Sequence, residues 1–176
     1  MSCGLRSIAF FEYDTILGRI TIEEIDGHIT RILPVFDANG GNGRKSETKL
    51  IQEAFRQIEA YFHGRLFEFS LPLAPQGTDF MQLVWQALRE IPYGKTVSYK
   101  EIAVKIGHPK ATRAVGMANN RNPIAIVIPC HRVIGSNGQL VGYRYGLENK
   151  RQLLDLESRY GKRNPVFFDK RLNDDF

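Results

Sequence analysis

Cysteine is scarce in this chain, which has only Cys3 and Cys130 among its 176 residues. Two cysteines are too few for a disulfide scaffold, and an intracellular chain would keep both reduced. A four-ligand zinc site would need Cys3 together with histidines, and no pair of these residues has a recognised metal-ligand spacing. We therefore expect no structural metal.

Long hydrophobic runs are also lacking. The longest apolar run, residues 124–130, has the length of a core strand and is far too short to cross a membrane. The N-terminus has no basic region followed by an apolar stretch, so we expect no signal peptide. These features predict a cytoplasmic protein without a membrane partner.

Charge is distributed unevenly along the chain. Residues 1–76 carry 8 Lys and Arg against 10 Asp and Glu, whereas residues 77–176 carry 16 against 9. A basic half beside a mildly acidic half indicates that one face meets a polyanion. The alternative is an ordinary solvated basic surface, and the charge alone favours neither.

Residues 1–76 are expected to form a small α+β domain and a linker. Runs rich in β-branched and aromatic residues predict strands at 8–13, 18–24 and 28–33, with turns at Asp14-Thr15 and Asp26-Gly27. The glycine-rich stretch 39–43 predicts a flexible loop. Residues 46–62 have the apolar spacing of a helix, and 72–77 resemble a linker.

Residues 77–158 are expected to form a second, mostly helical domain, followed by a tail over 159–176. Thr78 can cap its first helix, in which Trp85 is expected to be a core residue, and Ser98 and Glu101 fit a capping box for a helix to about 106. Pro109 suits the first turn of a further helix over 109–119. In the tail, residues 166–168 either pack on the core or fray.

The two helices around residues 107–109 fit a helix-turn-helix. The buried face of the second helix is expected to hold Ala111, Ala114, Val115 and Ala118. Lys110, Arg113 and Met117 fall on another face, and Gly116 leaves room for DNA to approach the backbone closely. The alternative is an ordinary helical hairpin with a surface arginine. The expected fold class is thus α+β, an antiparallel-sheet domain joined to a helical, winged-helix-like domain.

Cys130 follows the apolar run 124–128, which predicts a buried strand that Pro129 ends. A cysteine held at the end of a rigid element beside His131 fits a nucleophile, because an imidazole can take the thiol proton. The alternative is a buried structural cysteine, which is the more common case for a lone cysteine.

Three motifs make the pattern specific. They are Arg113-Ala114-Val115-Gly116, Asn122-Pro123, and the run Ile128-Pro129-Cys130-His131-Arg132-Val133. Together they closely resemble the O6-alkylguanine-DNA alkyltransferases, and the match extends from about residue 78 to residue 157. It includes residues 94–99 upstream, and Gly142-Tyr143, Gly146-Leu147 and 153–157 downstream.

The resemblance implies a role for each matched residue at the cysteine. Cys130 would accept the alkyl group, His131 would act as general base through a water, and Glu157 would orient His131. Asn122 would hold the segment before the cysteine. Tyr99 would help to extrude the nucleotide and would protonate guanine N3.

The resemblance also implies the DNA-contacting and pocket residues. Arg113 would fill the gap left in the duplex. The other DNA-contacting positions would be Tyr99, Lys110, Ala114 and Gly116. The pocket would be lined by Met117, Val133, Tyr143, Arg144 and Tyr145. Arg144 and Tyr145 stand where several relatives have small residues, so we expect a narrow pocket that disfavours benzyl groups.

The function that the resemblance implies is direct reversal of DNA damage. An alkyl group would pass from O6 of guanine, with O4 of thymine as a second candidate, to Cys130 after base flipping in the minor groove. The thioether has no hydrolytic exit, so each molecule would act once, without cofactor or metal. We expect a monomer on double-stranded DNA, with cooperative binding as an alternative. A non-catalytic lesion binder and a cysteine hydrolase unrelated to DNA are the competing interpretations.

Overall fold

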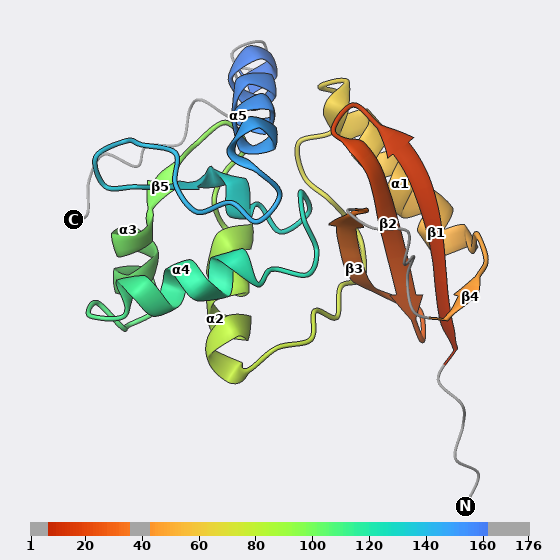
Figure 1. Ribbon diagram of the computed structural model, residues 1–176, viewed down its shortest axis with the longest axis horizontal. Helices are drawn as coiled ribbons and strands as arrows, with labels where there is room; N and C mark the ends of the chain where they lie inside the picture. The colour runs from red at the N-terminus through yellow and green to blue at the C-terminus, as the bar shows by residue number, and fades with distance from the viewer. Residues whose placement is uncertain (1–6, 36–42, 162–176) are drawn as a thin grey trace, which may run out of the picture.

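The computed structural model describes residues 7–35 and 43–161. The expectations for Cys3, for residues 39–42 of the loop and for 166–168 of the tail lie outside these residues. Figure 1 shows a sheet with one helix against it and, beside them, a group of helices. The α+β fold class is confirmed.

The N-terminal domain is built on a sheet in which β3, β2 and β1 are antiparallel and β4 lies parallel to β1. Its strands are β1 (Ile8–Thr15), β2 (Gly18–Ile25), β3 (His28–Pro34) and β4 (Arg44–Lys45). The turn predicted at Asp14-Thr15 is wrong, because both residues pair with β2. The turn lies at residues 16–17 instead, and across it Thr15 Oγ1 donates to the Gly18 carbonyl oxygen at 2.6 Å.

Helix α1 (Lys49–Phe62) lies against this sheet (Figure 1). It begins three residues later than the sequence predicts, because Thr48 is its N-cap and accepts a hydrogen bond from the Ile51 amide at 3.2 Å. Its buried face includes Ile51, Ile58 and Tyr61. Tyr61 thus lies deep in the molecule although its helix belongs to the N-terminal domain.

Four helices and two short strands make up most of the C-terminal domain. They are α2 (Asp79–Arg89), β5 (Val97–Ser98), α3 (Tyr99–Lys105), α4 (Thr112–Asn120), β6 (Val133–Ile134) and α5 (Leu147–Gly161). The Thr78 cap and the Ser98–Glu101 capping box are both confirmed. Helix α5 runs three residues past the expected boundary at 158.

Helix α4 differs from its prediction at its N-terminal end. It begins at Thr112, because the Ala111 amide donates to the His108 carbonyl oxygen at 2.8 Å and closes a separate turn that contains Pro109. Its buried residues are Val115, Ala118 and Asn119. The predicted burial of Ala111 and Ala114 is wrong, since Ala111 is half-buried and Ala114 is exposed.

The apolar segment 124–128 is buried as predicted, but it is not a strand. Only Ile124 makes a bridge, with Ile32 of β3, and the chain then turns back on itself, with Ile126 at φ 72°. A strand would need a neighbour for its carbonyl groups. Here the side-chain amide of Asn122 donates to the carbonyl oxygens of Ile124 and Ile128 instead.

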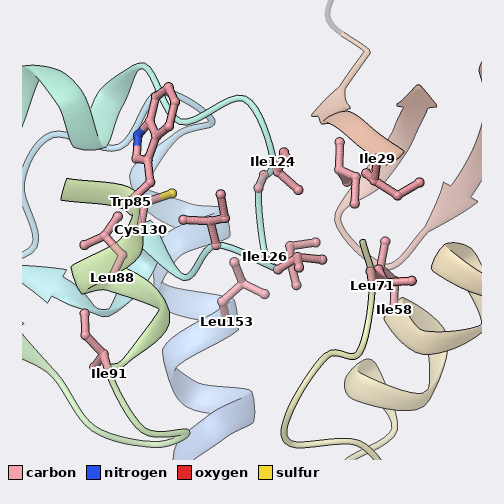
Figure 2. Packing of buried hydrophobic residues seen from close by; sticks show 14 of the residues in the cluster. Ile29, Ile58, Leu71, Trp85, Leu88, Ile91, Ile124, Ile126, Cys130 and Leu153 are labelled. Atoms are coloured by element: carbon pink, nitrogen blue, oxygen red, sulfur yellow. The ribbon is translucent and has the colours of Figure 1, made fainter. Parts of the chain in front are cut away.

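This segment joins the cores of the two domains. In Figure 2, Ile124 and Ile126 lie between Ile29 of the sheet on one side and Trp85 with Leu153 on the other. Trp85 is a core residue as expected, 1% exposed. Among the described residues, no helix has the length and apolar character needed to cross a membrane.

Candidate functional site

Cys130 lies inside the molecule, next to the core residues of Figure 2. It is 1% exposed and is the first residue of a short 3-10 helix, Cys130–Arg132, directly after Pro129. The sequence instead predicted that it follows a strand. Its Sγ accepts a hydrogen bond from Nδ2 of Asn122 at 3.1 Å, so the sulfur has a fixed donor.

Asn122 ties the residues before the cysteine into one unit. Its Nδ2 donates to the Ile128 carbonyl oxygen at 2.8 Å, and its Oδ1 accepts from the Ile124 amide at 3.0 Å. Its own carbonyl oxygen accepts from the Tyr145 hydroxyl at 3.1 Å. A single buried amide therefore sets both the turn that precedes Cys130 and the donor that faces its sulfur.

The thiol is held mostly in its protonated form. Burial raises the pKa of Cys130, while hydrogen bonds from Asn122 and Tyr143 and the positive charge of Lys150 lower it without offsetting the burial. The reactive form of a cysteine nucleophile is the thiolate. The site therefore needs a base that removes the proton and a cation that stabilises the sulfur charge.

Lys150 supplies that cation, and sequence reasoning missed it. Its side chain is fully buried, and its Nζ donates to the carbonyl oxygens of Val133 at 2.6 Å and Val141 at 2.9 Å. Burial lowers the pKa of Lys150 to about 8, against the opposing attraction of Cys130. Lys150 shares the buried face of α5 with Leu153 and Glu157, so the spacing in the sequence carried a usable signal.

His131, the residue after the cysteine, is the candidate base, and Glu157 holds its ring. Nε2 of His131 lies 2.8 Å from Oε1 of Glu157, and both side chains are fully buried. An ionised carboxylate only accepts hydrogen bonds, so Nε2 carries the proton. In the neutral ring Nδ1 is then an acceptor, and it has no hydrogen-bond partner among the described residues.

Glu157 is ionised because several donors converge on it. Arg132 donates from Nη2 to Oε1 at 2.9 Å and from Nε to Oε2 at 3.0 Å, and the Gly94 amide donates to Oε2 at 3.0 Å. Burial alone would raise the pKa of Glu157, but the hydrogen bonds that His131 and Arg132 donate, together with the positive charge of Arg132, outweigh it and hold the pKa well below its usual range.

His131 is neutral for the opposite reason. Burial lowers its pKa, and the charges of Arg132 and Lys150 lower it further, against the attraction of Glu157. A neutral imidazole with a free Nδ1 can accept a proton. The arrangement of Cys130, His131 and Glu157 can thus do the chemistry of an activated thiol, in which a second residue takes the proton and a third orients it.

The predicted pocket residues differ in their burial and in their contacts with the thiol. Tyr143 is half-buried and donates toward Cys130, and Val133 is fully buried with its carbonyl oxygen on Lys150. Tyr145 is buried, with its ring edge-on to Tyr143 at 5.4 Å. Arg144 is exposed. Tyr145 is therefore a buried ring beside Tyr143, whereas the side chain of Arg144 is at the surface.

The predicted DNA-contacting residues lie on one exposed helix and its neighbour. On α4, Arg113 and Ala114 are exposed, and Lys110 is exposed just before the helix. Met117, which was predicted for the pocket, is 57% exposed on the same helix. A Cβ built on Gly116 would meet the Tyr99 ring at 3.9 Å. Tyr99 begins α3, and its hydroxyl donates to the Val141 carbonyl oxygen at 3.1 Å.

The described residues do not contain a cluster of side chains that could hold a metal ion. Within residues 7–35 and 43–161, no group of three or more His, Cys, Asp or Glu side chains is placed to hold a metal ion. The charged residues at the thiol are instead engaged with one another, as Glu157 is with Arg132.

Comparisons with known proteins agree with one another. The family model described as the 6-O-methylguanine DNA methyltransferase DNA-binding domain matches residues 79–159, and the ribonuclease-like domain of the same methyltransferase matches residues 11–75. A methylated-DNA–protein-cysteine methyltransferase from Methanosarcina barkeri is 67% identical over 109 residues, which are 62% of this chain and 69% of the relative.

Two further relatives cover most of the chain. A methylated-DNA–protein-cysteine methyltransferase from Mycolicibacterium paratuberculosis is 43% identical over 164 residues, 92% of this chain and 99% of the relative. The crystal structure of Mycobacterium tuberculosis OGT in complex with DNA is 43% identical, with a TM-score of 0.81 over 86% of this chain and 94% of that one.

Proposed function

Because this chain belongs to the 6-O-methylguanine DNA methyltransferase family, we propose that it repairs DNA by moving an alkyl group from O6 of guanine to the sulfur of Cys130. The observation that supports this most strongly is the buried thiol itself. Its sulfur has an amide donor in Asn122, a cation in Lys150 and, next to it in the chain, a base held by Glu157.

The transfer is a displacement at the alkyl carbon. Nδ1 of neutral His131 takes the thiol proton through a water, and the Cys130 thiolate attacks the carbon. The new S–C bond forms as the C–O6 bond breaks, and the electron pair of that bond stays on guanine. The proton that Cys130 gives to His131 is balanced by the one proton that guanine takes up as it leaves, so that an ordinary base and a thioether remain. A thioether has no hydrolytic exit, which makes the protein a single-use acceptor.

The approach to DNA uses the α3–α4 pair as a helix-turn-helix. Arg113, exposed on α4, would enter the duplex from the minor groove and fill the place of the damaged nucleotide. A stacked guanine does not offer its O6 substituent to a thiol that is 1% exposed, so the base must leave the stack. Tyr99, which begins α3, would meet the rotated nucleotide.

The setting of the reaction follows from the same chemistry. The protein would act as a monomer in the cytoplasm, where the thiol stays reduced. Residues 77–176 carry the net positive charge that attracts DNA without sequence preference, so binding should weaken as salt rises.

One experiment separates this function from a lesion binder and from a thiol hydrolase. The full-length protein is incubated with duplex DNA bearing O6-methylguanine labelled in its methyl group, and label on protein is counted against moles of protein. We expect up to one methyl group per molecule, with no label on Cys130→Ala. Binding of the duplex without transfer would support the lesion binder, and the absence of both would support the hydrolase.

A further inference from the structure

One of the donors to Glu157 comes from the N-terminal domain. Tyr61, on α1, donates its hydroxyl to Oε1 of Glu157 at 2.7 Å, and the same hydroxyl lies 3.4 Å from Nε2 of His131. The Tyr61 side chain is fully buried. Glu157 and His131 are separated from Tyr61 by 96 and 70 positions in the sequence, so only the packing of the two domains brings the three together.

The hydroxyl is fixed in place by its surroundings. The Tyr61 ring packs against Phe69 at 5.5 Å and against Tyr93 at 5.8 Å, measured between ring centroids. The domains are also joined through the backbone, because the Ile32 amide donates to the Pro123 carbonyl oxygen and the Ala125 amide donates to the Ile32 carbonyl oxygen, each at 2.9 Å. The domain that carries Tyr61 is therefore held against the segment that leads to Cys130.

Tyr61 shares its acceptor atom with His131. Both groups meet Oε1 of Glu157, the oxygen that sets the tautomer of the imidazole. Burial first and then the charge of Glu157 raise the pKa of Tyr61 well above its ordinary value, so the hydroxyl stays protonated and remains a donor. A donor on Oε1 spreads the carboxylate charge and limits how strongly Glu157 can stabilise a protonated His131.

We propose that Tyr61 is a positioning residue for the Glu157–His131 pair, so that the N-terminal domain contributes directly to activation of the Cys130 thiol. This inference rests on the proposed function of the thiol. Without the hydroxyl, Oε1 would carry more uncompensated charge and would hold the imidazolium more strongly. His131 would then stay protonated to higher pH and would be a less available base.

Tyr93 provides a matched control. It is a second buried tyrosine near Glu157, 5% exposed and edge-on to the ring of Tyr61, and its hydroxyl has no hydrogen-bond partner in the described part of the chain. Tyr61→Phe and Tyr93→Phe thus remove the same atom from neighbouring rings. Only the first substitution removes a donor from Glu157.

The test compares the wild-type protein with these two variants as full chains. Methyl transfer from an oligonucleotide is followed under single-turnover conditions with saturating protein, between about pH 5.5 and 9. We expect Tyr61→Phe to react about tenfold more slowly at neutral pH and its rate to rise at a higher pH than that of the wild type. Tyr93→Phe should match the wild type. An unfolded fraction lowers the amplitude and leaves the rate constant unchanged.

A pH titration of the His131 ring by NMR gives a readout independent of DNA. It should show the imidazole of Tyr61→Phe titrating at higher pH than that of the wild type. A Tyr61→Phe profile that overlays the wild type, or equal slowing in both variants, would overturn the inference. Failure of the wild type to accept methyl would refute the proposed function instead, and the His131 titration would still decide the role of Tyr61.

Discussion

Nε2 of His131 lies 2.8 Å from Oε1 of Glu157, in a place where neither side chain is exposed. This contact fixes the imidazole so that Nδ1 is the free acceptor. Arg132, the residue after His131, forms an ion pair with Glu157 and keeps it ionised at neutral pH. The orientation of the His131 ring therefore depends on this ion pair. The Glu157 carboxylate therefore contributes both to the stability of the fold and to the reactivity of the thiol.

Glu157→Gln should lower both the stability of the protein and the rate of methyl transfer. The amide keeps the shape but leaves the buried Arg132 without a counter-charge, which is expected to cost about 3–5 kcal/mol of stability. Methyl transfer should slow by about a hundredfold, since a neutral amide orients His131 and stabilises its protonated form less well than the carboxylate does. Urea unfolding and single-turnover transfer measure the two effects. Glu148→Gln, at an exposed position of the same helix, is the control and should match the wild type.

Stability should fall in acid in two steps. The pKa of His131 is lowered in the folded protein, so protons favour the unfolded chain and stability is lost as pH falls below about 6.5. The pKa of Glu157 is also lowered, so its contribution is complete above about pH 4.3 and is lost below that. The free energy of unfolding, measured by urea titration at each pH, gives the curve.

His131→Gln should remove the upper step of that curve. His28→Gln changes an exposed histidine and should retain the step. A wild-type stability that stays constant between about pH 7 and 5 would contradict the assignment of a buried, neutral His131.

Much of the fold could be predicted from the sequence, because its local signals are strong. Strands β1 to β3 follow runs of β-branched and aromatic residues, and the caps Thr78 and Ser98 mark the starts of their helices. The segment 124–128 was predicted wrongly as a strand. An apolar run shows burial, but only tertiary structure shows whether a neighbouring strand is present for its carbonyl groups.

The candidate site was less accessible to sequence reasoning in two places. Lys150 was missed because a lysine in a polar helix is usually exposed, although its spacing from Leu153 and Glu157 places it on their face. Tyr61 could not have been assigned, since its contact with Glu157 depends on how the two domains pack. The roles of the motif residues were predicted from the family resemblance. That resemblance gives no information about contacts with residues outside the motifs.

Lys150→Met should raise the pKa of the Cys130 thiol. The substitution removes the cation that favours the thiolate and leaves the carbonyl oxygens of Val133 and Val141 without this donor. Alkylation of the thiol by iodoacetamide, followed across pH, should therefore slow at neutral pH and recover at higher pH. Lys105→Met changes an exposed lysine and serves as the control. An unchanged thiol pKa would show that Lys150 is only structural.

Gly116→Ala should separate DNA binding from stability. The new Cβ meets the Tyr99 ring at 3.9 Å, an ordinary contact, and alanine should stabilise α4 by roughly 1 kcal/mol. If the α4 backbone approaches DNA at Gly116, the methyl group should weaken binding to duplex while transfer from free O6-benzylguanine is unchanged. Binding is measured by fluorescence anisotropy. Unweakened duplex binding would place the contact elsewhere on the helix.

The loop after Tyr143 should limit the size of the alkyl group. Tyr145→Gly is expected to raise the rate on O6-benzylguanine relative to O6-methylguanine, and Arg144→Gly, at an exposed position, is expected to raise it less. Tyr145→Gly should also cost about 3–5 kcal/mol of stability, because a buried ring and its hydrogen bond to the Asn122 carbonyl oxygen are lost. The ratio of the two transfer rates is the measurement, and a ratio unchanged in both variants would contradict a narrow pocket.

The central claim is that Cys130 itself accepts the alkyl group, once per molecule. Tryptic digestion after reaction with methylated duplex yields the peptide 122–132, in which Cys130 is the only cysteine. Mass spectrometry should find one added methyl group on Cys130, with the modified fraction rising to match the moles of lesion supplied. An unmodified Cys130 after complete loss of O6-methylguanine, or methyl groups lost in excess of protein, would contradict the account.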